Sequence, residues 1–317
     1  MKCRVSFARP AALRPSDKVA VVAPAGPFDR ALFDAGLAVL ASRYRPVFGE
    51  GLFERRGYFA GEDLRRGAEL SAALADDSIR AVFAARGGYG CMRLLPKLSL
   101  AGLSPKPVVG FSDVTALHGA LQASGWVSVH GPVVTQLGRQ PRPSADRLFA
   151  LLESDAPAAP LQATATRVPG VVEGPLVGGN LSVLTRLIGT PYLPPLDGAV
   201  LLIVDVGERP YRLDRMWTHL ALAGVFRRVR GIAVGELTGC EEPDLPPGAG
   251  PSERPLRSDE VLQALAQETG LPCASGFPIG HGALNLAVPL GTRVRLDATA
   301  RTLSFLEPAV GGPEHPR

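Results

Sequence analysis

The sequence Pro107-Val108-Val109-Gly110-Phe111-Ser112-Asp113 joins a short apolar run to residues 114–121, where apolar side chains recur at helical spacing. This pattern predicts a strand, a tight turn that carries Ser112, and a helix. A serine on such a turn has its hydroxyl held clear of the sheet. The N–H groups that open the helix also face any negative charge that forms beside it. This arrangement is that of the nucleophile elbow of a serine hydrolase.

Ser112 also has an ordinary explanation, because serine is one of the preferred residues at a helix N-cap. The elbow pattern G-x-S-x-G lacks its second glycine, since Val114 stands at that position. The tetrapeptide 110–113 alone therefore favours capping, and the case for catalysis depends on the rest of the chain.

The composition indicates a folded protein of two domains. The chain has 317 residues, of which 46% are hydrophobic and 20% are charged. No apolar run approaches the roughly 20 residues that cross a bilayer. Charged residues also interrupt the early apolar residues, so the N-terminus does not read as a signal peptide. We expect a cytoplasmic protein without membrane association.

Charge and motifs argue against several classes of partner. The net charge of +4 is scattered and aromatic residues make up only 6%, so no nucleic-acid partner is expected. Neither a P-loop nor G-x-G-x-x-G occurs, which disfavours nucleotide binding. The cysteines lack C-x-x-C spacing, and neither a zinc site nor a disulfide framework is expected for Cys3, Cys91, Cys240 and Cys273. We expect no metal and no cofactor.

The first half of the chain alternates strand and helix patterns, which predicts a parallel sheet covered on both faces. Apolar strands at 19–22, 81–85 and 107–109 end at turns that carry Pro24, Gly87 and Ser112. Because ligands bind outside the carboxyl ends of parallel strands, these turns should meet at one edge. We assign residues 1–145 to an N-terminal α/β domain that carries Ser112.

The second half has a different pattern. Residues 146–170 are rich in Pro, Ala, Thr and Ser and are predicted to form a linker. Residues 171–307 then form a second domain, with strands at 200–204 and 232–234, helices at 213–222 and 261–266, and a β-like end. Residues 308–317 are predicted to be a tail.

Three glycine-rich sites have two interpretations each. Arg86-Gly87-Gly88-Tyr89-Gly90 provides either a backbone donor for an oxyanion or a purely structural turn. Gly178-Gly179-Asn180 either approaches a ligand at a helix N-terminus or simply caps that helix. In Gly280-His281-Gly282, a loop histidine is more often an exposed bystander, but its flanking glycines leave the imidazole accessible from both sides.

Taken in order, these motifs resemble the LD-carboxypeptidases, serine peptidases that remove the terminal D-alanine from murein tetrapeptides. The resemblance covers residues 19–305. It rests on residues 86–90 and 110–113 together with Gly178-Gly179-Asn180-Leu181, Ile188-Gly189-Thr190-Pro191, Glu208-Arg209-Pro210-Tyr211-Arg212-Leu213-Asp214-Arg215 and Gly280-His281.

The resemblance implies a fold and a mechanism. The fold is a flavodoxin-like N-terminal domain of the class I amidotransferase type, with a smaller swivelling β/β/α C-terminal domain. The site lies in the groove between them, holds no metal, and belongs to what is commonly a homodimer. By position, Ser112 is the nucleophile, His281 is the base, and the N–H groups of Gly88 and Asp113 form the oxyanion hole. Substrate binding is expected at Tyr89, Gly179 and Asn180.

One position departs from the family pattern. The resemblance implies a Ser-His-Glu triad whose glutamate precedes Asp205, and this sequence has Val204 there. Either Asp205 or Glu208 supplies the carboxylate, or the triad is reduced to a dyad. Glu208 is favoured because its longer side chain reaches further across a groove. Both acids also have structural explanations, since Asp205 can cap the turn and Glu208 can pair with an arginine.

The sequence therefore predicts a serine carboxypeptidase that hydrolyses the L,D-amide bond of a murein tetrapeptide during cell-wall recycling. A second interpretation is an immunity hydrolase that acts on a peptide–nucleotide antibiotic. A third, from a different class, is a non-catalytic peptide-binding protein on the same scaffold.

Overall fold

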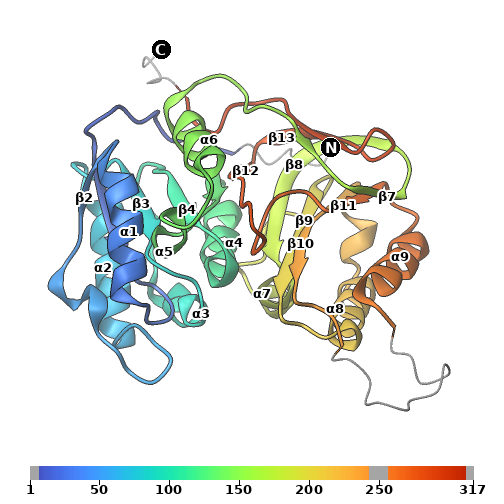
Figure 1. Ribbon diagram of the computed structural model, residues 1–317, viewed down its shortest axis with the longest axis horizontal. Coiled ribbons are helices and arrows are strands. Elements are labelled where there is room, and N and C mark those ends of the chain that lie inside the picture. Colours follow the sequence, from blue (N-terminus) through green and yellow to red (C-terminus); the bar gives the residue numbers. More distant parts are fainter. Residues whose placement is uncertain (1–6, 243–255, 312–317) are drawn as a thin grey trace.

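The computed structural model describes residues 7–242 and 256–311, and these form two sheets with their helices (Figure 1). The first sheet has six strands in the order β12 (Val288–Leu290), β5 (Ser128–His130), β4 (Val108–Gly110), β3 (Ala81–Ala84), β1 (Lys18–Val22) and β2 (Arg45–Val47). Strands β1 to β5 pair in parallel, and β12 pairs antiparallel with β5.

Helices cover both faces of the first sheet, as the alternating pattern predicts. One core contains side chains of three helices, α1 (Arg30–Ala41), α5 (Val134–Leu137) and α6 (Arg142–Glu153). The core on the opposite face contains those of α2 (Asp63–Ala75), α3 (Cys91–Leu94) and α4 (Thr115–Ala123). Short 3₁₀ helices lie at Glu50–Phe53, Leu95–Lys97, Ser112–Val114 and Val225–Arg227.

The second sheet has eight strands in the order β6 (Leu161–Gln162), β14 (Thr302–Phe305), β13 (Arg293–Asp297), β8 (Val171–Asn180), β9 (Val200–Val206), β10 (Gly231–Thr238), β11 (Cys273–Ser275) and β7 (Ala165–Val168). Helices α7 (Leu181–Leu187), α8 (Pro210–Leu222) and α9 (Ser258–Thr269) pack on one face. The other face packs against residues 277–290, which include β12. The mixed α/β fold with two sheets agrees with the sequence prediction.

The chain crosses between the sheets more often than the predicted domain boundaries suggest. Residues 146–170 contain most of α6 and the strands β6 and β7 of the second sheet. Strand β12 belongs to the first sheet although it lies within residues 171–307. Ala309 and Val310 are buried in the core of the first sheet, so the predicted tail is packed at its start, and residues 312–317 lie outside the described residues.

The described helices include none with the length and apolar character needed to span a bilayer. Three of the four cysteines, Cys91, Cys240 and Cys273, are buried free thiols, and Cys3 lies outside the described residues.

Candidate active site

Ser112 lies on a tight turn between β4 and α4. Its φ angle is +62°, a left-handed conformation that a residue other than glycine rarely adopts. Phe111 before it is extended, and the 3₁₀ turn Ser112–Val114 leads directly into α4. A serine held in this strained conformation at the carboxyl end of a strand has the geometry of a nucleophile elbow.

The missing second glycine of the elbow motif has a local explanation at Gly110. A Cβ atom on Gly110 would lie 2.9 Å from Cγ1 of Val114 and 3.1 Å from Cβ of Ala84. The absence of a side chain at 110 therefore makes room for the valine at 114. The turn can be built with one glycine because that glycine stands opposite the bulky residue.

The three strand exits meet at one edge of the first sheet, as the sequence predicts. The N–H of Gly26 donates to the carbonyl oxygen of Gly87 over 3.0 Å. A Cβ atom on Gly87 would lie 2.9 Å from Cβ and 3.1 Å from Oγ of Ser112. The glycine loop 86–90 therefore lies against the hydroxyl of Ser112, and a side chain at 87 would collide with it.

Asp113 ties this glycine loop to the turn. Its Oδ2 accepts a hydrogen bond from the N–H of Cys91 over 2.8 Å. Burial raises the pKa of the Asp113 carboxyl, and the hydrogen bonds from Cys91 and the charge of Arg66 oppose that rise. Gly88 has a φ of +108°, which requires glycine. The oxyanion role of the Gly88 and Asp113 N–H groups stays a prediction.

His281 reaches the same place from the second half of the chain. Its ring lies on the ring of Phe111, with centroids 4.7 Å apart. Burial lowers the pKa of His281 to about 4, so the imidazole is neutral at pH 7, as a general base must be. Its Nδ1 is buried and has no hydrogen-bond partner among the described residues.

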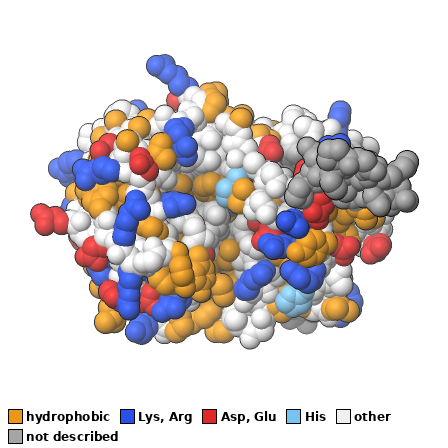
Figure 2. Space-filling view, turned by 60° about the horizontal axis from the view of Figure 1, so that its bottom comes forward, with side chains coloured by type: hydrophobic (Ala, Val, Ile, Leu, Met, Phe, Trp, Pro, Cys, Tyr) orange, Lys and Arg blue, Asp and Glu red, His pale blue; other side chains and the backbone are white. Residues whose placement is uncertain are grey.

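Histidine atoms are visible in a hollow near the middle of the face in Figure 2, between the two halves of the molecule. His118 and His130 are fully buried, and burial lowers the pKa of both. Within the described residues, His, Cys, Asp and Glu form no group of three or more that could hold a metal ion.

The predicted substrate-binding residues differ in exposure. Tyr89 is 46% exposed and packs with Tyr58 and Phe59 in a surface aromatic cluster, with ring centroids 5.9 and 5.6 Å from its own. Gly179 has a φ of +142°, and a Cβ atom there would lie 2.6 Å from Oγ1 of Thr115. Tyr89 is thus available to a ligand, whereas Gly179 serves the contact between β8 and α4.

Asn180 is buried, and its polar atoms are engaged inside the protein. Its Oδ1 accepts from the N–H of Val183 over 3.0 Å, which caps α7, and its Nδ2 donates to Asp205 over 2.8 Å. The N–H of Asn180 donates to Oγ1 of Thr115 over 2.9 Å. These contacts match the capping interpretation and link α7 to the helix that follows Ser112. A substrate-binding role for Asn180 stays a prediction.

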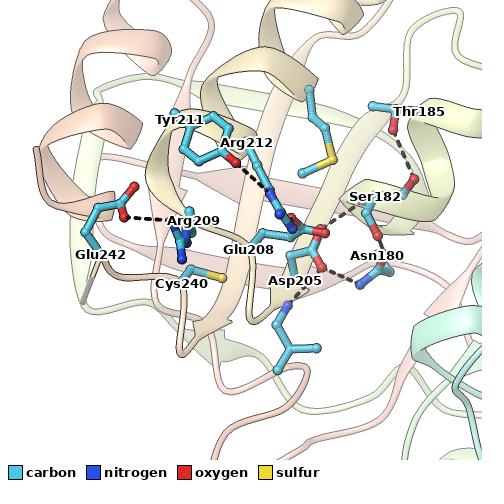
Figure 3. Close-up of polar contacts among 12 residues, drawn as sticks. Asn180, Ser182, Thr185, Asp205, Glu208, Arg209, Tyr211, Arg212, Cys240 and Glu242 are labelled. Atoms are coloured by element: carbon cyan, nitrogen blue, oxygen red, sulfur yellow. Dashed lines mark hydrogen bonds and ion pairs between the residues drawn. The ribbon is translucent and has the colours of Figure 1, made fainter.

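Figure 3 shows Asp205 and Glu208, the two acids that the sequence predicts as candidates for the triad. Asp205 is buried and accepts hydrogen bonds from Asn180 Nδ2 and from the N–H groups of Ser182 and Val206, at 2.8 to 2.9 Å. Burial raises the pKa of Asp205 to about 6, although these bonds oppose the rise. Glu208 accepts from Nη1 of Arg212 over 3.4 Å. The contacts of both acids match the structural explanations given above. The catalytic roles of Asp205 and Glu208 stay predictions.

Glu236 is a further acid, beside the glycines that flank His281, that the sequence analysis does not single out. A Cβ atom on Gly282 would lie 2.8 Å from Cδ and 3.1 Å from Oε1 of Glu236. Burial raises the pKa of this carboxyl. Its signal in the sequence is weak: a single glutamate follows Gly235, at the end of a predicted strand.

The fold and this site together define an α/β protein of the hydrolase class. Residues 19–131 match the model of the LD-carboxypeptidase N-terminal domain, and residues 173–296 match that of the LD-carboxypeptidase C-terminal domain. The chain therefore belongs to the LD-carboxypeptidase family, which confirms the resemblance seen in the sequence.

Three known proteins illustrate this relationship. The murein tetrapeptide carboxypeptidase of Pseudomonas aeruginosa is 33% identical over 298 residues, covering 88% of this chain and 93% of the relative. The microcin C7 self-immunity protein of Escherichia coli is 27% identical over 287 residues, covering 79% and 80%. The solved muramoyltetrapeptide carboxypeptidase from Oxalobacter formigenes has a TM-score of 0.79 at 26% identity, covering 91% of this chain and 97% of that one.

Proposed function

We propose that this protein is a serine-type LD-carboxypeptidase that releases the terminal D-alanine from murein tetrapeptides in the cytoplasm. The proposal is carried by one observation. The ring centroids of His281 and Phe111 lie 4.7 Å apart, and Phe111 directly precedes Ser112, whose φ angle is in the strained left-handed region. A neutral histidine and a serine on an elbow are the two groups that this chemistry requires. The relative from Pseudomonas aeruginosa supports the choice of substrate.

The proposed reaction uses Ser112 as nucleophile and His281 as base. His281 takes the proton of Ser112 Oγ while that oxygen attacks the carbonyl carbon before the D-alanine. The oxyanion that forms accepts hydrogen bonds from the N–H groups of Gly88 and Asp113. When the intermediate collapses, the C–N bond breaks and the leaving amine takes the proton from His281. Water then attacks the resulting ester by the same route and returns the proton to Ser112.

Each group contributes a separable part of the rate. A serine hydroxyl is a weak nucleophile near pH 7 until a base takes its proton. Each backbone donor aimed at the oxyanion is worth about 3 kcal/mol in the transition state. The glycine loop would contribute to the rate separately from the serine, because it brings a backbone N–H towards Ser112 without a side chain in the way.

Incubation with a murein tetrapeptide and mass spectrometry of the products tests this function. We expect free D-alanine and a tripeptide from the wild type, and neither from Ser112→Ala with its fold intact. Ser124→Ala, at the C-cap of the same helix α4, is the matched control and should retain activity. Tight binding without turnover would favour the peptide-binding interpretation. Turnover of a peptide–nucleotide conjugate alone would favour the immunity hydrolase.

We also propose a homodimer, as the family resemblance implies. Light scattering coupled to size-exclusion chromatography tests this state directly. A mass of one chain, 33.3 kDa, would contradict it.

A further inference from the structure

We propose that Glu236 is the residue that orients His281, in place of a carboxylate at position 204. The inference rests on the proposed function, since it assigns a positioning residue to the base of that reaction. It depends on the backbone at β10, on the side-chain contacts of Glu236, and on the unpartnered Nδ1 of His281.

A β-bulge in β10 aims Glu236 at the histidine loop. Val234 pairs with Ile203 and Leu237 pairs with Asp205, so residues 235 and 236 together stand opposite the single residue Val204. Bulges re-aim side chains and are frequent beside active sites. The N–H of Glu236 also donates to the carbonyl oxygen of Ile279 over 2.8 Å. The bulge is thereby fixed to the segment that leads into His281.

The side chain of Glu236 lies beside both glycines that flank His281, and its carboxyl group lies at Gly282. A Cβ atom on Gly282 would lie 2.8 Å from Cδ of Glu236, and one on Gly280 would lie 3.5 Å from its Cβ. A side chain at 282 would therefore collide with the carboxyl group of Glu236, whereas a Cβ atom at 280 would make only ordinary contact with this glutamate. A rotation of the glutamate's terminal torsions is sufficient to redirect its oxygens, because χ3 of glutamate is broad and soft.

The imidazole lacks the partner that a carboxylate would supply. His281 Nδ1 is buried without a hydrogen-bond partner among the described residues, a condition that costs about 1–3 kcal/mol. Burial disfavours the charged forms of both His281 and Glu236. A hydrogen bond from Nδ1–H to the carboxylate satisfies the buried nitrogen, and it stabilises the imidazolium that forms during the reaction.

Val204 is the neighbour of Glu236 on the adjacent strand. Its Cβ would lie 3.3 Å from a Cβ on Gly280, so both side chains flank the same glycine. Val204 is fully buried and apolar. A carboxylate placed at either position therefore lies beside the histidine loop, which allows the acid to be moved from one strand to the other as a test.

The decisive experiment compares the wild type with Glu236→Gln, which keeps the shape and removes the charge. The rate at which a fluorophosphonate labels Ser112 is measured across pH, together with the kcat and KM for the tetrapeptide. We expect kcat and the labelling rate to fall by about 10²- to 10⁴-fold, since loss of the orienting carboxylate of a triad costs up to about 10⁴-fold. KM should stay unchanged. The acid limb of the labelling profile should shift to lower pH, because the lost carboxylate no longer favours the imidazolium.

Two further variants separate positioning from packing. Val204→Glu combined with Glu236→Gln returns a carboxylate to the other strand and should recover much of the lost rate. Glu153→Gln is the matched control, because Glu153 is a half-buried glutamate that pairs with Arg43 and Tyr44 at the opposite edge of the first sheet. If Glu236→Gln does not fold, Glu236→Asp keeps the charge on a shorter side chain and should show the same pH-dependent loss to a smaller degree.

The outcomes distinguish this inference from the proposed function. Labelling that depends on Glu236, without release of D-alanine, supports the positioning role and rejects the murein substrate. Release of D-alanine at the wild-type rate by Glu236→Gln overturns the positioning role alone. A rate loss without recovery in the double variant and without a pH shift makes Glu236 structural and also overturns it. No labelling of wild-type Ser112 overturns both.

Discussion

The imidazole of His281 lies on the phenyl ring of Phe111, with ring centroids 4.7 Å apart and planes inclined by 51°. His130 contacts the same phenyl ring, with centroids 5.7 Å apart and planes inclined by 63°. Phe111 precedes Ser112 and is buried, so one side chain contacts His281 and belongs to the turn that carries Ser112. The site is assembled from two sheets through this aromatic contact.

Phe111→Leu tests that contact. Leucine fills most of the buried volume, so the free energy of unfolding should fall by less than about 1.5 kcal/mol. The ring contact with His281 is lost, however, and misplacement of a catalytic group by about 1 Å can cost about 10²-fold in rate. We expect a clear fall in kcat for the tetrapeptide. Phe33→Leu, within the aromatic cluster of α1, is the control. Equal kcat values in the two variants would show that the contact is not needed.

The left-handed conformation of Ser112 should lower the free energy of unfolding, and the protein retains this conformation for function. Ser112→Gly relieves that strain, whereas Ser112→Ala keeps it. We expect both variants to be inactive and the glycine variant to be more stable than the alanine variant by about 1 kcal/mol. Urea denaturation of the two measures the difference. A less stable glycine variant would mean that the turn is not strained.

Gly282→Ala should act through Glu236 and leave His281 in place. The added methyl group would lie 2.8 Å from Cδ of Glu236, and the flexible end of that side chain can move away. We expect little change in stability and a fall in kcat, up to about 10²-fold. Gly67→Ala within α2 is the control, because the added methyl group has ordinary contacts only. If the Gly282→Ala variant is as active as this control, Glu236 has no role in catalysis.

Acid should destabilise the protein through its buried histidines. Burial lowers the pKa of His118 and His281 from 6.5 to about 4. The unfolded chain therefore binds protons that the folded chain does not, and the free energy of unfolding falls as pH drops from about 6.5 to 4. Asp205 acts in the opposite direction between about pH 6 and 3.8, since its pKa is raised to about 6.

His118→Gln isolates one of these contributions. Nε2 of His118 lies 2.9 Å from the carbonyl oxygen of Gly110, and a glutamine amide can donate to the same oxygen. The loss of stability between pH 6.5 and 4, followed by urea denaturation, should be smaller in this variant than in the wild type. An unchanged pH dependence would show that His118 is not held neutral by the fold.

The local parts of the site could be predicted from the sequence because they are encoded by adjacent residues. The turn at Ser112, the glycine loop and the glycines around His281 each carry a local signature, and parallel strands bring their exits to one edge. The family resemblance then related these segments across the chain. Val204 stands out as a departure from the family pattern for the same reason.

The acid at 236 and the crossings between sheets could not be predicted in this way. Glu236 reaches the histidine loop only because of a bulge between Val234 and Leu237, which depends on pairing with another strand. Strand β12 has only three residues and joins a sheet whose other strands lie at least 158 residues earlier in the chain. Neither feature has a signature within a short window of sequence, since each is decided by tertiary contacts.

The most direct test of the account is capture of the acyl-enzyme. The protein is mixed with murein tetrapeptide, quenched in acid within one turnover, and digested for peptide mapping by mass spectrometry. We predict that the acyl group of the tripeptide is attached to Ser112, and that less of it accumulates in Glu236→Gln because that variant forms it more slowly. Release of D-alanine with no mass added to Ser112 at any time, or an adduct on another residue, would contradict a serine nucleophile.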